Sequence, residues 1–289
     1  MERAAPSESK LWSEDTLDVD GTTLAMYTRG RVDGPLLVMF HGLGHWALGC
    51  WSAAAHELER DYRMIAFDLP GFGSSDKPDA AYDLDYFTSI CHGALERVAP
   101  HGATLVGHSL GGLISAAIAA EHPTLVRGLI LVSSAGFKIA RPWTIAFMGN
   151  KLTAPMFAIQ PSRWFVRRTL MRTVYDPRSI DAEQFETAYA ALADPRVRRS
   201  FSRVYAAAIH EIGDFSRIRE VISRYRGPVL GVFGSHDPYI PIDVVDAVQS
   251  AYPHARVEIF GKCGHCAHIE YPKQFAQLVR DVVPIEHAP

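Results

Sequence analysis

The sequence lacks the features that mark membrane-spanning, secreted and nucleic-acid-binding chains. Its uninterrupted apolar runs are a few residues long, far below the roughly 20 residues that a membrane-spanning helix needs. The first fifteen residues mix charges with a proline and contain no apolar stretch typical of a signal peptide. The net charge of −3 gives no general attraction to nucleic acid or to an anionic membrane. These absences predict a cytoplasmic globular protein with no nucleic-acid partner and no membrane span.

Cysteine is also scarce. The four cysteines are Cys50, Cys91, Cys263 and Cys266. Without a secretion signal we expect free thiols. Cys263 and Cys266 form a C-x-x-C spacing with His265 and His268 interleaved, but a closed zinc site usually takes a second ligand pair, and no matching spacing occurs elsewhere. The sequence therefore predicts no metal site.

What the sequence does contain is an alternation of short apolar runs with longer helical patterns, over 289 residues that are 48% hydrophobic. An Asp20-Gly21 turn joins two alternating segments into a predicted hairpin. Further strands are predicted at Leu36–Phe40, Arg63–Phe67, Thr104–Val106, Leu129–Val132, Val229–Phe233 and Val257–Phe260. Helices are predicted at Tyr86–Val98, Leu110–Glu121, Phe215–Arg226, Val244–Tyr252 and Pro272–Val283. This alternation favours an α/β fold built on a mostly parallel sheet with helices on both faces.

One segment, residues 137–214, interrupts the alternation. It has a helical pattern with five prolines and no convincing strand. It carries twelve basic and seven acidic residues, a net charge of +5 against −8 for the rest of the chain. We therefore expect a catalytic core formed by 1–136 and 215–289, and a helical cap formed by 137–214 over the active edge of the sheet.

The segment Gly107-His108-Ser109-Leu110-Gly111 matches the pattern G-x-S-x-G between a predicted strand and a predicted helix. In that context the small glycines let the backbone turn sharply, which strains the central residue and exposes the Ser109 hydroxyl above the sheet edge. The following helix directs its N-terminal amides at developing negative charge. Ser109 is therefore the predicted nucleophile.

A serine nucleophile needs a base, and the base needs an orienting acid. Asp237 and His265 each follow the end of a predicted strand, in the chain order serine, acid, histidine. His268 and His236 are rival bases. Asp243 is a rival acid, although we expect it to cap the helix that begins at Val244.

The predicted oxyanion hole joins the amide of Leu110, directly after the nucleophile, to the amide of Leu43 in the loop His41-Gly42-Leu43-Gly44. His41 is expected to hold this loop by hydrogen bonding without transferring protons. Gly42 and His108, which adjoin these groups, are predicted substrate contacts.

These motifs together resemble the α/β-hydrolase fold superfamily. The resemblance rests on the residues quoted above, on Asp68-Leu69-Pro70-Gly71-Phe72-Gly73-Ser74-Ser75-Asp76, on Gly234-Ser235-His236-Asp237 and on Glu270-Tyr271-Pro272. It covers nearly the whole chain and implies an eight-stranded, mostly parallel sheet, a helical cap inserted after strand six, and no cofactor. We expect the loop 68–76 to shape the pocket without taking part in chemistry.

A serine at the elbow argues against the epoxide hydrolases and haloalkane dehalogenases of this superfamily, which use aspartate there. The first interpretation is a serine hydrolase that cleaves a small or medium, apolar carboxylic ester through an acyl-enzyme. The alternative is a carbon–carbon bond hydrolase of a ring-cleavage, vinylogous diketone acid. These enzymes usually have a proline after His-Gly, where this chain has Leu43. A third possibility is a non-catalytic ligand-binding protein of the same fold.

The arginines of the basic cap offer a way to distinguish the ester hydrolase from the carbon–carbon bond hydrolase. Arg167 and Arg168, or Arg198 and Arg199, could clamp a substrate carboxylate with paired hydrogen bonds. Arg167 and Arg168 are the predicted substrate contacts, and a carboxylate clamp would favour the carbon–carbon hydrolase.

Overall fold

The computed structural model describes residues 11–138, 140, 147, 150, 152–153, 156–157, 159–211 and 215–285. The strands are β1 (Ser13–Val19), β2 (Thr22–Gly30), β3 (Leu36–Phe40), β4 (Arg63–Phe67), β5 (Ala103–His108), β6 (Val126–Val132), β7 (Val229–Gly234) and β8 (Arg256–Phe260). They form one sheet in the order β1-β2-β4-β3-β5-β6-β7-β8. β2 pairs antiparallel with both of its neighbours and all other pairs are parallel. The predicted eight-stranded, mostly parallel sheet is confirmed.

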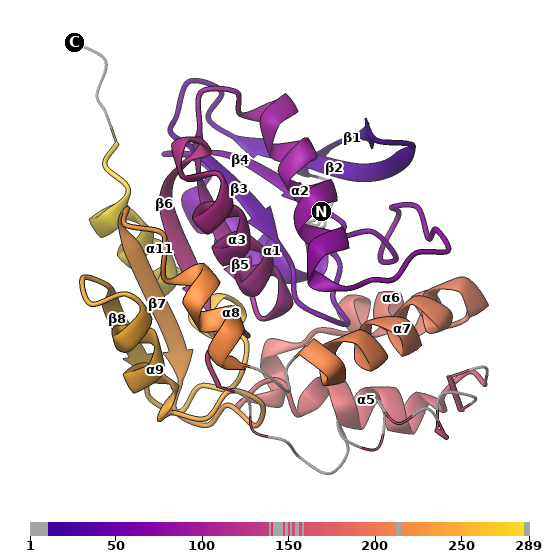
Figure 1. The fold of residues 1–289 in the computed structure, drawn as a ribbon. Helices are drawn as coiled ribbons and strands as arrows, with labels where there is room; N and C mark the ends of the chain where they lie inside the picture. The colour runs from indigo at the N-terminus through magenta and orange to yellow at the C-terminus, as the bar shows by residue number, and fades with distance from the viewer. Residues whose placement is uncertain are drawn as a thin grey trace, which may run out of the picture.

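The α-helices that cover this sheet follow the predicted alternation (Figure 1). They are α1 (Ala47–Leu58), α2 (Leu84–Val98), α3 (Leu110–Glu121), α8 (Phe215–Ile222), α9 (Val244–Ala251), α10 (Ala267–Glu270) and α11 (Pro272–Val282). The sequence analysis did not identify α1. The predicted hairpin is present, because Val19 pairs with Thr22 across Asp20 and Gly21, which both have positive φ.

The strands β3 to β7 bury both of their faces, whereas the edge strands β1 and β8 are partly exposed. In β3, Val38 and Phe40 pack in a core with residues of α2 and α3, while Leu37 and Met39 pack in a second core with residues of α1 and α11. Successive side chains of a strand point to opposite faces, so a continuous apolar run of this kind requires helices on both sides. This is why the apolar runs of the sequence predict the sheet so closely.

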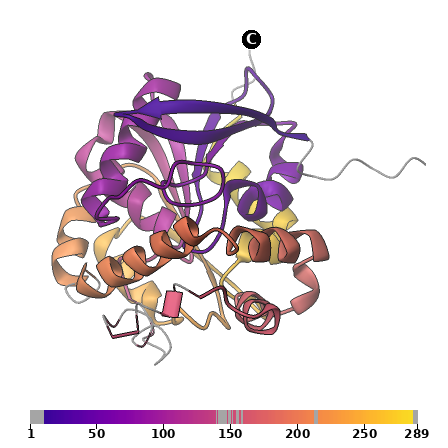
Figure 2. The same cartoon turned by 90° about the vertical axis from the view of Figure 1, so that its right-hand side faces the viewer.

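Between β6 and β7 the described residues form helices and no strand. Three of these helices are α5 (Arg163–Met171), α6 (Ala182–Ala191) and α7 (Pro195–Glu211), which we call the inserted helices. They lie beyond the carboxyl ends of the parallel strands (Figures 1 and 2). The cap boundaries at 137 and 214 stay predictions, since residues 212–214 lie outside the described residues.

The backbones of β3, β5 and α3 are in close contact behind the turn at Ser109. A Cβ atom on Gly107 would lie 2.3 Å from the Gly111 carbonyl oxygen, and one on Gly111 would lie 2.2 Å from the Phe40 carbonyl oxygen. Contacts this short cannot be relieved by moving a side chain, because both neighbours are backbone atoms. The glycines of the motif are therefore required by packing between β3, β5 and α3.

This packing gives a stability prediction. Gly107→Ala is expected to lower the free energy of unfolding by about 1–3 kcal/mol, because the new methyl group displaces backbone. Gly261→Ala is the matched control, since no atom lies within 4 Å of the added Cβ, and it should change stability by less than about 0.5 kcal/mol. Urea unfolding of the two variants measures the difference. Equal stability of the two variants would contradict the packing argument.

Candidate active site

Ser109 has the strained backbone that its motif predicts. It lies between β5 and α3 with φ 52° and ψ −112°. Its amide donates a hydrogen bond to the Val132 carbonyl at 2.9 Å, and its carbonyl accepts one from Ala135 at 3.0 Å. A non-glycine residue with positive φ persists only where its surroundings fix it, and such residues gather at active sites. The turn holds Ser109 at the carboxyl edge of the sheet.

Asp237 and His265 form a buried pair at the same edge. The Nδ1–H of His265 donates to Asp237 Oδ2 at 2.7 Å, and the Asp237 side chain is fully buried. Asp237 also accepts hydrogen bonds from the amides of Tyr239 and Ile240. Burial disfavours the charged carboxylate, but the charge and hydrogen bond of His265 and the two amides outweigh it, so the pKa of Asp237 lies below its ordinary value. The Asp237 carboxylate therefore orients the imidazole ring of His265.

His108, which directly precedes Ser109, connects the nucleophile turn to the loop of His265. The Nε2–H of His108 donates to the His265 carbonyl oxygen at 3.1 Å, and the two rings lie 4.7 Å apart. His108 is buried. Its ring therefore positions the loop of His265 beside Ser109. A substrate contact through His108 or Gly42 stays a prediction.

The rival triad residues have other partners. His236 is exposed and shares a hydrogen bond with Ser235, and His268 is buried against Trp51. The capping role expected for Asp243 is wrong. Asp243 stands at the N-cap position of α9, but its carboxylate binds the Lys138 ammonium and makes no hydrogen bond to the helix. The exposed lysine competes successfully for that carboxylate.

The loop after β3 lies against the nucleophile, where the predicted oxyanion hole requires it. A Cβ on Gly42 would be 3.0 Å from the Ser109 Cβ. His41 Nδ1–H donates to the Gly42 carbonyl at 2.8 Å, and His41 Nε2 accepts from the Leu69 amide at 2.9 Å. Both ring nitrogens are thus engaged in holding loops, as the sequence analysis expects. The Leu110 amide begins α3, and the first amides of a helix have no partner within the helix.

The loop after β4 is built around Asp68. Its buried carboxylate accepts hydrogen bonds from the Ala47 amide at 2.6 Å, from the Ser74 amide at 2.7 Å and from the Tyr27 hydroxyl at 3.2 Å. The loop places Phe72 between His41 and Phe201 of α7, with ring centroids 5.8 and 5.3 Å away. By holding this loop, Asp68 positions the Phe72 ring between the oxyanion loop and the inserted helix α7.

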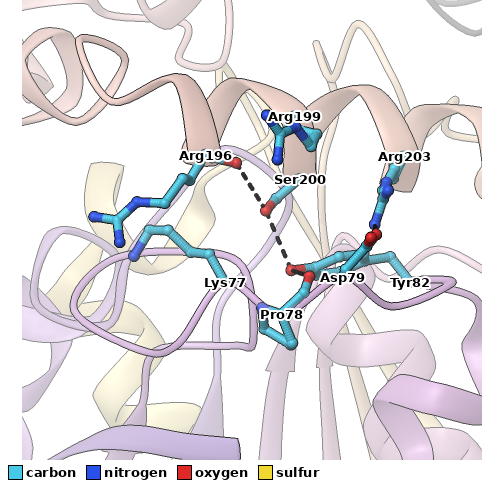
Figure 3. A pocket seen from close by; sticks show the side chains of 8 residues that line it. All are labelled: Lys77, Pro78, Asp79, Tyr82, Arg196, Arg199, Ser200 and Arg203. Carbon is cyan, nitrogen blue, oxygen red and sulfur yellow. Dashed lines mark hydrogen bonds and ion pairs between the residues drawn. The ribbon is translucent and has the colours of Figure 1, made fainter.

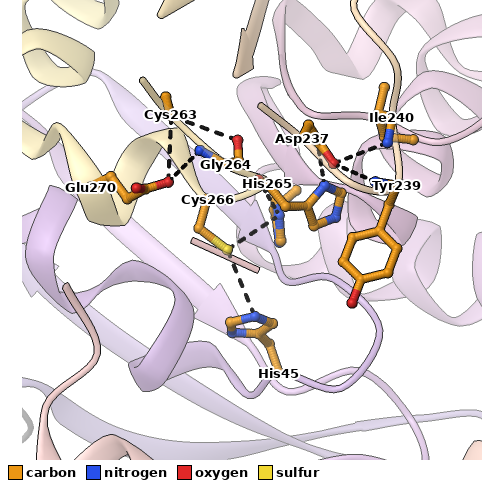
Figure 4. A network of polar contacts seen from close by, with 10 residues as sticks. His45, Asp237, Tyr239, Ile240, Cys263, Gly264, His265, Cys266 and Glu270 are labelled. Carbon is orange, nitrogen blue, oxygen red and sulfur yellow. Dashed lines mark hydrogen bonds and ion pairs between the residues drawn. The ribbon is translucent and has the colours of Figure 1, made fainter. Parts of the chain in front are cut away.

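The loop of His265 is bonded to the segment that follows α5. Figure 4 shows the Glu270 carboxylate bound to Gly264 of this loop. The His265 amide donates to the Thr173 carbonyl at 2.7 Å. The carboxylate of Glu270 accepts from the amides of Gly264, Tyr175 and Asp176. These bonds join the catalytic loop to the inserted helices through the backbone. The sequence analysis assigned Glu270 no role, since only the folded chain brings residues 264, 175 and 176 together.

Arg172, an exposed residue that the sequence analysis did not select, follows the end of α5 and adjoins a segment bonded to the loop of His265. The Tyr239 ring packs on His265 with centroids 5.2 Å apart. Burial raises the pKa of Tyr239, and the positive charge of Arg172 opposes that rise. Arg172 also directly precedes Thr173, whose carbonyl binds the His265 amide. Its position at the end of α5 gives no signal in the sequence.

The arginines that the sequence analysis selected lie elsewhere. Arg167 and Arg168 are exposed on α5, and Arg168 stacks over the Trp164 ring. Arg198 is buried and donates to the carbonyls of Leu192 and Ala193.

Arg199 lines a pocket between α7 and the loop after β4 (Figure 3). The residues that line this pocket are Lys77, Pro78, Asp79, Tyr82, Arg196, Arg199, Ser200 and Arg203. Substrate binding by Arg167 and Arg168 stays a prediction that this geometry does not support.

With this geometry established, comparison with known proteins identifies the family. A family model for the alpha/beta hydrolase fold matches residues 35–272. The chain belongs to the α/β-hydrolase fold family. This confirms the resemblance inferred from the motifs, and hydrolase activity of this kind is supported.

Individual relatives are more specific. A 2-hydroxymuconate semialdehyde hydrolase from a Pseudomonas species is 31% identical over 251 residues, covering 85% of each chain. A pimeloyl-[acyl-carrier protein] methyl ester esterase from Nitrosomonas europaea is 30% identical over 250 residues, covering 84% of this chain and 93% of the esterase. Among solved structures, a 2-hydroxy-6-oxo-6-phenylhexa-2,4-dienoate hydrolase from a Rhodococcus species has a TM-score of 0.82 at 21% identity, covering 93% of this chain and 98% of that one. The two hydrolases are named for small-molecule substrates, and the esterase for a methyl ester carried on acyl-carrier protein. Among the described residues, no helix has the length and apolar character to cross a membrane.

The predicted nucleophile can be tested directly. Ser109→Ala should lower kcat about 10⁴-fold or more, because the remaining groups cannot form an acyl-enzyme. Ser235→Ala, which removes a hydroxyl from the same sheet edge, is the matched control and should retain turnover. The assay is hydrolysis of p-nitrophenyl acetate, with circular dichroism to verify folding. Unchanged turnover in Ser109→Ala would exclude this serine as the nucleophile.

The Asp237 carboxylate gives a second test. Asp237→Asn should lower kcat about 10⁴-fold, because an amide favours the wrong imidazole tautomer. Since the folded pKa of Asp237 is lowered, ionisation stabilises the wild type fully above the unfolded carboxyl pKa of about 4, and this contribution is lost as the pH falls through the folded pKa. The stability difference between wild type and variant should therefore be larger at pH 7 than at pH 3. A difference that grows on acidification would contradict the lowered pKa.

Proposed function

We propose that the protein hydrolyses a carbon–carbon bond in a ring-cleavage, vinylogous diketone acid, using Ser109, Asp237 and His265. The sequence analysis placed an ester first and this reaction second. The relatives support the carbon–carbon reaction better than the ester, since the relative at 31% identity is a 2-hydroxymuconate semialdehyde hydrolase. A 2-hydroxy-6-oxo-2,4-heptadienoate hydrolase from Pseudomonas putida is also 27% identical over 259 residues.

The observation that carries the proposal is the position of Arg172. A ring-cleavage acid has a carboxylate at one end and the reacting ketone at the other, whereas a neutral ester has no charge to bind. Arg172 directly precedes Thr173, whose carbonyl accepts a hydrogen bond from the His265 amide at 2.7 Å, and its charge acts on Tyr239, whose ring packs on His265. A guanidinium binds a carboxylate with two parallel hydrogen bonds and so fixes orientation as well as charge. Arg172 would thus hold the acid end of the substrate while the ketone lies over Ser109.

The chemistry follows from the groups at the sheet edge. Ser109 Oγ attacks the ketone carbon as His265 Nε2 accepts its proton, and the amides of Leu43 and Leu110 stabilise the tetrahedral oxyanion. Collapse breaks the carbon–carbon bond. The departing carbon takes the bonding electron pair, which delocalises into the conjugated keto acid, and receives the proton from His265. Water then attacks the acyl-Ser109, with His265 again as the base, and releases the second acid.

Asp237 supports each proton transfer without being protonated. Its carboxylate, held by the amides of Tyr239 and Ile240, keeps the Nδ1 proton of His265 in place and leaves Nε2 free to act as base. The aromatic side chains of Phe72 and Phe201 lie beside the oxyanion loop. They would exclude water from one side of the reacting carbonyl.

Ester hydrolysis is the second candidate, because the same acyl-enzyme chemistry serves both reactions. Its specific support is the 30% identity to the pimeloyl-[acyl-carrier protein] methyl ester esterase. Ester hydrolysis requires the triad and the oxyanion hole but no cation at Arg172. The arginine therefore separates the two candidates.

Two arginine variants test this assignment. Arg172→Gln should lower kcat/KM for 2-hydroxymuconate semialdehyde about 10–100-fold, because a charge-assisted hydrogen bond contributes about 1.5–3 kcal/mol, and should leave turnover of neutral p-nitrophenyl acetate within twofold. Arg168→Gln is the matched control on the exposed face of α5 and should change neither. The decay of the dienolate absorbance follows the reaction. Hydrolysis of the ester with none of the acid by the wild type would overturn the proposal.

A further inference from the structure

A second group of reactive side chains lies behind the nucleophile turn. Cys50 of α1, His108 at the end of β5 and His268 of α10 are all buried. Cys50 Sγ lies 3.2 Å from His268 Nε2 and 3.8 Å from His108 Nδ1. These three atoms all lie within 4.8 Å of one another. Three separate elements thus direct a sulfur and two imidazole nitrogens at one point.

The hydrogen bond from His108 Nε2 to the His265 carbonyl leaves Nδ1 of the same ring available as a metal ligand. The carbonyl of His265 can only accept, so the Nε2 of His108 carries the proton of that bond and Nδ1 presents its lone pair to Cys50. Neutral imidazole is the form that binds metals, through the ring nitrogen that carries no proton. His268 Nε2 lies 3.2 Å from the Cys50 sulfur, so this nitrogen also faces Cys50.

The thiol is the one group that must change. A free cysteine thiol is mostly protonated at neutral pH, whereas metals bind the thiolate, so the sulfur must lose a proton when a metal binds. One thiol hydrogen faces two imidazole nitrogens and can satisfy only one of them. A metal ion in place of that hydrogen would engage all three atoms at once. The Cys50 proton would leave to solvent as the metal–sulfur bond forms, without any change in oxidation state.

The charge and softness of the donors indicate which ion fits. One thiolate and two neutral imidazoles carry a charge of −1, and no carboxylate belongs to the cluster. A monovalent ion gives a neutral complex in this dry interior, whereas a divalent ion leaves an uncompensated positive charge, which is costly to bury. Thiolate ligands also select copper(I) over harder ions.

The spacing of the donors is compatible with one ion. With metal–sulfur and metal–nitrogen distances of about 2.3 and 2.0 Å, donors around one ion are separated by about 3.3–3.8 Å. The two sulfur–nitrogen separations of 3.2 and 3.8 Å fall next to and at the limit of this range, and the two ring nitrogens lie within 4.8 Å of each other. We propose that Cys50, His108 and His268 form a three-coordinate binding site for copper(I), held one residue behind Ser109. The C-x-x-C spacing considered in the sequence points elsewhere, since Cys263 is not part of it.

Cys266 is a second cysteine close to His108, and the test must distinguish a metal bound at Cys50 from one bound at Cys266. Cys266 Sγ lies 4.0 Å from both His45 Nε2 and His108 Nε2. The Nε2 of His108 already donates to the His265 carbonyl, so a metal at Cys266 would have to break that bond. Cys91, by contrast, is buried in the apolar core of α2. It provides a matched control cysteine with no imidazole partner.

The experiment is a competition for copper(I) under anaerobic conditions. Purified full-length protein is titrated with the copper(I)–bicinchoninate complex, whose colour is lost as the protein withdraws the metal. We expect one copper(I) per chain for the wild type and for Cys91→Ser and Cys266→Ser, and an affinity at least about 100-fold lower for Cys50→Ser and His268→Gln. Copper binding unaffected by Cys50→Ser, or abolished by Cys266→Ser alone, would overturn the assignment.

A measurement on the wild type makes the test independent of variant folding. X-ray absorption of the copper-loaded protein should give one sulfur and two nitrogen neighbours. Two sulfur neighbours, or none, would overturn the proposed ligand set. Neither readout uses the hydrolase reaction, so failure of the carbon–carbon hydrolase proposal would leave this result unaffected.

Discussion

The close approach of backbone segments at the nucleophile turn is the constraint on which the rest of the site depends. β3, β5 and α3 meet at distances that allow no Cβ atom on Gly107 or Gly111. Because the segments are in contact, Ser109 is held with positive φ, the oxyanion loop after β3 lies against it, and α3 begins with its first amides at the sheet edge. A looser turn would separate the nucleophile from the groups that stabilise the charge it generates.

Much of this arrangement could be predicted because it follows from local patterns. β3 and β4 begin and end where their apolar runs do, since strands buried on both faces leave a continuous signal. The pairing of Asp237 with His265 was predicted from chain order and from the rule that parallel strands present their carboxyl ends at one edge. The roles of His41 and of the loop around Asp68 also followed from their motif positions.

The rest depends on contacts between residues distant in sequence. Asp243 has the residue type and position of a helix cap, yet Lys138, more than one hundred residues away, takes its carboxylate. Arg167 and Arg168 stand out in the sequence as a pair, and they are exposed on α5, as Arg172 is after its end, but only Arg172 directly precedes Thr173, whose carbonyl binds the His265 amide. Glu270 serves amides from two segments, one of which is almost one hundred residues earlier. No periodicity or motif encodes such partners.

The bonds that tie the His265 loop to the segment after α5 have an evolutionary consequence. The His265 amide binds the Thr173 carbonyl, and Glu270 binds amides on both sides. Since the partners at 173, 175 and 176 are main-chain atoms, these bonds are expected to tolerate exchange of the side chains there but not insertion or deletion of residues. Lineages that diverge in substrate range are therefore free to vary the inserted helices before and after this short stretch. The stretch itself must keep its length for the base to stay in register with the nucleophile.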